Sequence, residues 1–159
     1  MAPLLLVFSS DSAAQGAAGR LRALLATTEF ADPGQIDCRT MVQEVAADAP
    51  RQVLLCATSA EDVPALLDAL QAWQGIPPCP LSLVAASDAA QPAPWIERGV
   101  QAWAPLDGLD ASRLAVLLGE AQARWQREAA LHAETEALRT RLDERKWIDR
   151  AKGLLMSAR

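Results

Sequence analysis

The stretch LLLVFSSD, residues 4–11, decides how the rest of the sequence is interpreted. Five consecutive apolar side chains followed by small polar ones are typical of a strand buried on both faces of a parallel sheet. Two further apolar runs, residues 53–56 and 81–85, have the same character. Weaker candidates lie at residues 35–38 and 100–104. The sequence therefore predicts five strands.

Helical patterns separate these strands. The clearest covers residues 61–73, where apolar side chains recur every three or four positions, and Gly75 with the following prolines ends it. Weaker patterns cover residues 13–26, 41–49 and 94–98. Regular alternation of strands and helices predicts a parallel sheet with helices on both faces. Right-handed crossovers then favour a flavodoxin-like, doubly wound strand order.

The composition is that of a globular protein. The chain has 159 residues, of which 51% are hydrophobic and 22% charged, so it can build a core. The three cysteines and the single histidine form neither a zinc-binding pattern nor a disulfide framework. No apolar run is long enough to span a membrane, and the first residues lack the basic region of a signal peptide. We therefore expect a cytoplasmic protein without membrane contact, metal or cofactor.

Charge is distributed unevenly along the chain. The net charge is −5, but residues 1–118 carry 6 basic and 13 acidic side chains, whereas residues 119–159 carry 9 basic and 7 acidic. Residues 139–159 alone carry 7 basic and 3 acidic side chains. An acidic body with a basic end suggests different partners for the two ends, although a solvated helical face of mixed charge explains the same pattern.

The last third of the sequence predicts one long helix. Residues 111–158 contain no proline, and only Gly119 and Gly153 interrupt residues that favour helix. A helix of that length extends about 70 Å. Two apolar stripes along it, offset from each other, predict a dimer seam between two copies of the chain, formed by Leu118, Ala121, Trp125, Leu131, Leu138 and Leu142. The alternative is a helix that folds back on its own domain.

The five strand–helix units resemble the receiver domain of bacterial response regulators. Receivers need carboxylates for Mg²⁺, an acceptor aspartate, a hydroxyl and a lysine at successive strand ends, because these groups transfer a phosphoryl group. The matching positions hold Ser9, Ser10, Asp11, Cys56, Ala85 and Leu106. The resemblance therefore implies a degenerate phosphoacceptor pocket in a pseudo-receiver that is not an enzyme. We expect Cys56 to be buried and inert.

The segment RLDERKWIDRAKGLLM, residues 141–156, resembles the opening of an ANTAR domain. The order receiver, long helix, ANTAR is similar to that of transcription antiterminators, above all the NasT type of nitrate and nitrite assimilation, and also the AmiR type of amidase operons. This resemblance implies a receiver-like domain at residues 1–110, a coiled-coil helix at residues 111–142 and the first helix of an ANTAR domain at residues 143–159. The ANTAR domain is then expected to be truncated in this sequence.

The same resemblance implies the partners. The chain is expected to form a homodimer through its C-terminal helix, and a complete ANTAR domain to bind hairpins of a leader RNA. Basic side chains that meet phosphate supply much of the affinity in such complexes, and the candidates are Arg145, Lys146, Arg150 and Lys152. A cytoplasmic sensor protein for nitrate or nitrite is the implied protein partner.

Three other interpretations stay open. A conventional phosphorylated response regulator would need the acceptor aspartate and the lysine that the matching positions do not hold. A small flavodoxin-like enzyme would need residues 9–16 to cradle a phosphate, although they lack the glycine pattern. A coiled-coil signalling scaffold without RNA binding is the third.

Overall fold

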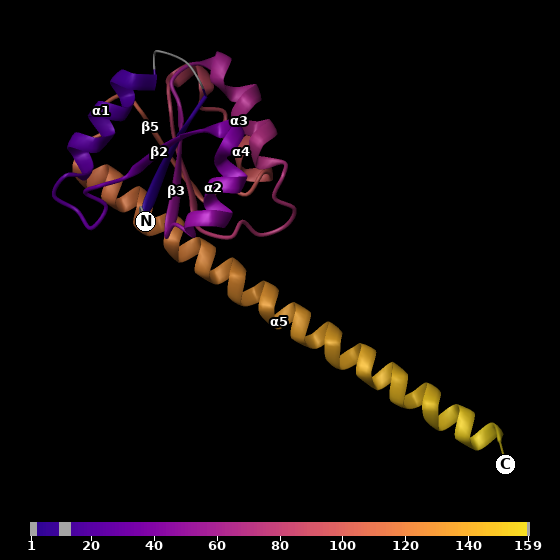
Figure 1. Cartoon of the computed structure of the whole chain (residues 1–159). Coiled ribbons are helices and arrows are strands. Elements are labelled where there is room, and N and C mark those ends of the chain that lie inside the picture. Colours follow the sequence, from indigo (N-terminus) through magenta and orange to yellow (C-terminus); the bar gives the residue numbers. More distant parts are fainter. Residues whose placement is uncertain (1–2, 10–13, 159) are drawn as a thin grey trace. The chain divides into compact units, whose positions relative to one another are not determined.

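A computed structural model describes residues 3–9 and 14–158. Five parallel strands form a single sheet in the order β2-β1-β3-β4-β5 (Figure 1). This is the flavodoxin-like order, so the predicted fold class is confirmed. The strands are β1 (Leu4–Phe8), β2 (Gly34–Asp37), β3 (Gln52–Ala57), β4 (Leu81–Ala85) and β5 (Ala102–Pro105).

Helices cover both faces of the sheet. They are α1 (Ala14–Leu25), α2 (Met41–Asp48), α3 (Val63–Leu70), α4 (Pro92–Glu97) and α5 (Ala111–Ser157), with short 3₁₀ turns at Cys38–Thr40, Ala60–Asp62 and Ser87–Ala89. Successive side chains of a strand point to opposite faces. In β1, Leu4 and Leu6 pack in the core formed with α1 and α5, whereas Leu5 and Val7 pack in the core with α2, α3 and α4.

Most element boundaries differ by one to three residues from the sequence prediction, and the differences at β5 and α3 have visible local causes. Strand β5 begins at Ala102 instead of residue 100, and it includes Pro105, which lies opposite Ala85 of β4. Proline is tolerated there because β5 is an edge strand and has a neighbour on one side only. Helix α3 ends at Leu70, three residues before the end of its predicted pattern, and a turn follows in which the amide of Trp73 donates to Leu70 O at 3.2 Å.

The chain divides into two compact units, which we call unit 1 (Met1–Trp125) and unit 2 (Gln126–Arg159). Unit 1 contains the sheet, helices α1 to α4 and the first 15 residues of α5, residues 111–125. Unit 2 consists of the remainder of α5. Among the described residues, no helix is both long and apolar enough to cross a membrane.

The beginning of the predicted dimer seam belongs to the core of unit 1. Leu118 and Ala121 are 4% and 0% exposed and pack with α1 and the sheet. Trp125 is partly buried, and its indole Nε1 donates to Pro77 O at 2.8 Å. Leu118 and Ala121 are therefore core residues of their own domain, and an intermolecular seam has to begin beyond them.

Candidate functional site at the carboxyl edge of the sheet

The parallel register gathers the receiver-like positions at one edge of the sheet. In that register Phe8 lies opposite Cys56, and Cys56 lies opposite Val84. Four of the six predicted positions are described and lie at this carboxyl edge: Ser9, Cys56, Ala85 and Leu106. Ser10 and Asp11 lie outside the described residues.

A buried carboxylate, Asp62, organises this edge, and the sequence analysis did not single it out. The hydroxyl of Ser9 donates to Asp62 Oδ1. Thr58 donates to Asp62 Oδ2 from its amide at 2.8 Å and from Oγ1 at 2.6 Å, and the amide of Ser59 donates to the same oxygen at 3.2 Å. The pattern that could have revealed it is the spacing Ser59-x-x-Asp62, a capping box at the start of the helical segment.

These hydrogen bonds keep Asp62 ionised. Burial by itself raises the pKa of Asp62. The hydrogen bonds from Ser9, Thr58 and Ser59 lower the pKa, and their combined effect is larger than that of burial, so the pKa lies below the usual 3.8. Both carboxylate oxygens are occupied by donors of the chain. The group therefore fastens the loop after β3 to the end of β1.

A second carboxylate connects the next loop. The amide of Ala60 donates to Asp88 Oδ2 at 3.1 Å, which joins the loop after β3 to the loop after β4. This contact is exposed. The edge therefore contains hydrogen-bonded loops around the buried carboxylate of Asp62, together with the exposed carboxylate of Asp88.

Cys56 lacks the exposure and the low pKa of a reactive cysteine. Its side chain is fully buried, and burial, reinforced by the negative charge of Asp62, raises the pKa of the Cys56 thiol to about 12. A thiol with such a pKa remains protonated near neutral pH and is a poor nucleophile.

The two remaining positions offer no polar side chain. The amide of Leu106 donates to Ala85 O at 2.9 Å, and the Leu106 side chain packs partly buried against the core. Within residues 3–9 and 14–158, no three histidine, cysteine or acidic side chains group together in a way that could hold a metal ion. What the described part of this edge shows is a set of loops joined by hydrogen bonds to Asp62 and Asp88.

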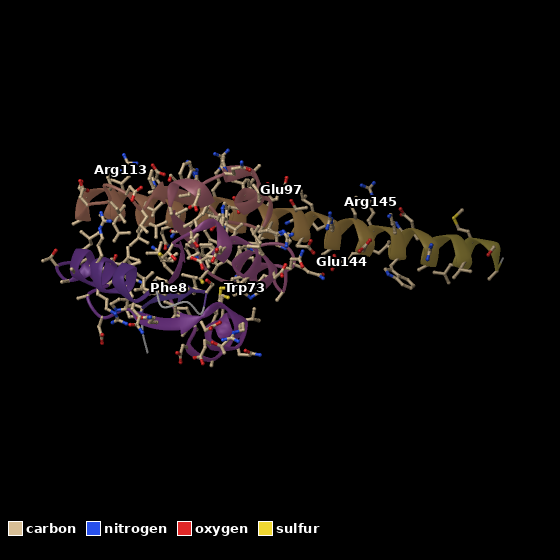
Figure 2. All side chains as sticks on the ribbon, turned by 90° about the horizontal axis from the view of Figure 1, so that it is seen from above. Phe8, Trp73, Glu97, Arg113, Glu144 and Arg145 are labelled. Atoms are coloured by element: carbon tan, nitrogen blue, oxygen red, sulfur yellow. The ribbon has the colours of Figure 1, made fainter. Side chains whose placement is uncertain are left out.

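Unit 2 carries the four basic residues predicted to contact RNA, and all of them are exposed. Lys146 and Arg150 lie four residues apart, and Arg145 and Lys152 lie seven apart, so each pair shares a side of the helix. The side chain of Arg145 stands out from the helix in Figure 2.

Apolar side chains occupy the other side of the same helical segment. Trp147, Leu154 and Leu155 are each more than 70% exposed, and Ile148 is 54% exposed. At about 100° per residue these side chains and the four basic ones point in opposite mean directions. The C-terminal segment of unit 2 therefore has an uncovered apolar side opposite the four basic side chains, and Met156, which is 76% exposed, and Asp149 share the basic side.

No protein-family model matches the sequence, and no curated protein matches it. Several solved structures are similar in their arrangement of strands and helices. The crystal structure of a two-component transcriptional regulator AraC from Clostridium phytofermentans ISDg is 15% identical, with a TM-score of 0.48, and the match covers 80% of this chain and 97% of that chain.

Two flavodoxin-type structures are also similar. Oxidised flavodoxin 1 from Bacillus cereus is 17% identical, with a TM-score of 0.42 and coverage of 78% of this chain and 97% of that one. A flavodoxin-like domain from Synechococcus sp. is 16% identical, with a TM-score of 0.37 and coverage of 88% and 99%. The strand order and the two helical layers of unit 1 themselves define the class of protein, a flavodoxin-like α/β fold.

Proposed function

We propose that this chain is a response-regulator-like protein of the cytoplasm that is controlled by a protein partner and not by phosphorylation. The observation that carries the proposal is the chemistry of the carboxyl edge. Cys56 is a buried, protonated thiol where the receiver resemblance requires an acceptor aspartate, and Leu106 stands where it requires a lysine. Among the described positions of this edge, these two supply neither the nucleophile nor the cation that phosphoryl transfer uses.

We propose that such a protein transmits its signal through unit 2, and that unit 2 pairs with the same segment of a second chain to form a dimer. Leu131, Leu138 and Leu142 are 53%, 52% and 58% exposed, and their spacings of seven and four residues place them on one side of the helix. A helix with such an uncovered stripe gains free energy by burying it against a second helix. Thr135 lies near the same stripe, and its Oγ1 donates to Leu131 O at 2.9 Å, so its hydroxyl already has a partner.

The proposed target of the output is RNA, and the proposed process is transcription antitermination. The basic side formed by Arg145, Lys146, Arg150 and Lys152 supports contact with phosphates. The resemblance of residues 141–156 to the opening of an ANTAR domain supports leader-RNA hairpins as the ligand. The same resemblance supports nitrate or nitrite as the signal, received through a sensor protein.

Sedimentation equilibrium of the full chain tests the dimer. Leu138→Glu places a charge in the proposed seam, and we expect the dimer dissociation constant to rise at least about tenfold. The matched control is Ala133→Glu, because Ala133 is exposed and lies nine residues, about two and a half turns, from Leu142 on the opposite side of the helix. A monomeric wild type, or equal effects of both substitutions, would contradict the seam.

A further inference from the structure

The exposed leucine stripe of unit 2 is bounded by opposite charges. Glu128 lies three residues before Leu131, and Arg145 lies three residues after Leu142. All four residues belong to α5, and all four are exposed. Residues three or four positions apart share a side of a helix. The stripe therefore begins with a carboxylate and ends with a guanidinium.

Both charged residues fit the heptad repeat of the leucines. Two sets of residues recur every seven positions and alternate along the stripe: Glu128, Thr135 and Leu142, and Leu131, Leu138 and Arg145. Sets with this alternating spacing occupy the two positions of each heptad that face the partner helix in a coiled coil. Glu128 and Arg145 therefore lie within the line of contact between two helices.

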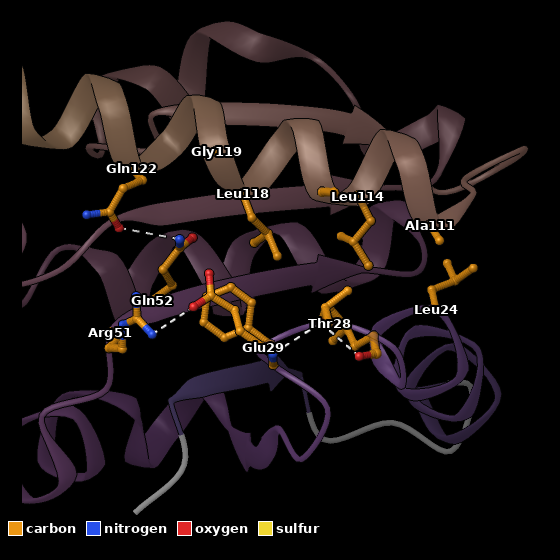
Figure 3. A pocket seen from close by; sticks show the side chains of 13 residues that line it. Leu24, Thr28, Glu29, Arg51, Gln52, Ala111, Leu114, Leu118, Gly119 and Gln122 are labelled. Carbon is orange, nitrogen blue, oxygen red and sulfur yellow. Dashed lines mark hydrogen bonds and ion pairs between the residues drawn. The ribbon is translucent and has the colours of Figure 1, made fainter.

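The first turns of α5 are occupied within unit 1 and cannot join this line of contact. Leu114 and Leu118 are buried, and they point toward the groove between α5, α1 and the start of β3 (Figure 3). Beyond Trp125, by contrast, no described residue of α5 is buried. The residues that can pair with a second helix therefore belong to unit 2.

A parallel pair of copies would bring like charges together. In a parallel coiled coil, each residue of the seam lies opposite the same residue of the second copy. Glu128 would then face Glu128, and Arg145 would face Arg145. Like charges that face each other across an interface are unfavourable, so both ends of the leucine stripe would oppose this arrangement.

An antiparallel pair brings opposite charges together. When Leu131 of one copy lies opposite Leu142 of the second, three residues backward along the first helix correspond to three residues forward along the second. Glu128 of one copy then lies opposite Arg145 of the other. Because the pair has twofold symmetry, the same contact forms again at its other end. The leucine stripe is therefore complementary to itself in this direction, which identifies a second copy of the chain as its partner.

We propose that two copies of this chain pair through unit 2 as antiparallel helices, with ion pairs between Glu128 of each copy and Arg145 of the other. This inference rests on the dimer proposed above, and it adds the direction and register of the two helices. The same register places Thr135 opposite Leu138, and the Thr135 hydroxyl already donates to Leu131 O. The Arg145 guanidinium has five N–H donors, so the ion pair leaves donors for a phosphate.

Charge reversal and sedimentation equilibrium of the full chain test the ion pair. Glu128→Arg places two guanidinium groups opposite each other, and we expect the dimer dissociation constant to rise at least about tenfold. Glu128→Arg/Arg145→Glu exchanges the two charges and should return the constant to within about threefold of the wild type. The matched control, Glu144→Arg, makes the same exchange at an exposed position two residues after Leu142, on the opposite side of the helix. Equal effects of Glu128→Arg and Glu144→Arg, or a double variant as weak as Glu128→Arg, would overturn the proposed pairing.

Disulfide formation under oxidising conditions reports the direction of the helices. In the antiparallel pair, the two copies of residue 128 are about 25 Å apart, the length of helix from residue 128 to residue 145, which no disulfide can span. We therefore expect no cross-link from Glu128→Cys alone or from Arg145→Cys alone, and a cross-linked dimer from an equimolar mixture of the two variants. The native cysteines are buried and do not compete. Cross-linking of either variant alone, or none in the mixture, would overturn the antiparallel direction and leave the dimer standing, whereas a monomeric wild type would overturn both.

Discussion

Ser9 and Asp62 lie 53 positions apart in the sequence and are joined by a hydrogen bond, in which the Ser9 hydroxyl donates to the Asp62 carboxylate. The contact ties the end of β1 to the segment between β3 and α3. In doubly wound folds, ligands bind at this edge of the sheet. Here a buried carboxylate with both oxygens occupied holds the loops of that edge together.

Removal of this carboxylate should destabilise unit 1. We expect Asp62→Ala to lower the free energy of unfolding by about 2–3 kcal/mol, because it removes a charged acceptor and leaves the Thr58 and Ser59 amides without it. Asp88→Ala, which removes an exposed acceptor from a single amide, should cost less than about 1 kcal/mol. Urea unfolding followed by tryptophan fluorescence measures both values. An equal decrease in the free energy of unfolding for both variants would contradict the conclusion that Asp62 holds the loops of this edge together.

The pKa of Asp62 predicts the direction of a pH dependence. Its folded pKa lies below 3.8, so its ionised form stabilises the fold fully above the unfolded pKa, and that contribution is lost as the pH falls below 3.8 and through the folded pKa. We expect the unfolding free energy of the wild type to fall more steeply than that of Asp62→Asn over this range. Parallel pH profiles of the two proteins would show that Asp62 is not held ionised by its neighbours.

The three cysteines should be unreactive in the folded protein. Cys38, Cys56 and Cys79 are free and buried, and burial raises the pKa of Cys56 and of Cys79 to about 12. Relative to the usual value of 9.0, these two thiols carry roughly a thousandfold less thiolate near pH 8. With a thiol-specific chromogenic disulfide at pH 8, we expect no rapid reaction in buffer and three equivalents in guanidinium chloride. Rapid reaction of Cys56 in the native protein would restore it as a candidate nucleophile.

RNA binding should be weak and sensitive to salt. Counterion release scales with the number of phosphates neutralised, and the basic side of unit 2 has four cations. In titrations of a two-hairpin leader RNA, Lys146→Gln/Arg150→Gln should lower the slope of log K against log salt by about 2. The control, Arg113→Gln/Arg127→Gln, removes the same charge at exposed positions elsewhere and should keep the wild-type slope. An equal decrease in slope for both double variants would show that net charge alone determines binding and would contradict contact through the basic side.

The sequence predicts the buried strands of this structure well, but it does not predict what covers each face of a helix. Strand β4 has the predicted bounds, because a strand buried on both faces requires a continuous apolar run. Asp62 was missed because its importance depends on Ser9, which is distant in sequence. Leu118 and Leu131 belong to similar apolar stripes, yet the first is 4% and the second 53% exposed. Periodicity identifies an apolar face, but it does not determine whether the chain's own sheet or another molecule covers it.

Intact-mass spectrometry tests most directly whether unit 1 is regulated without phosphorylation, as proposed above. The chain is incubated with Mg²⁺ and a small phosphodonor, next to an ordinary receiver domain as positive control. We predict that the control gains the mass of one phosphoryl group while this chain keeps its unmodified mass, since Cys56 is buried and protonated and Leu106 supplies no cation. A stable gain of one phosphoryl group by this chain would contradict the account.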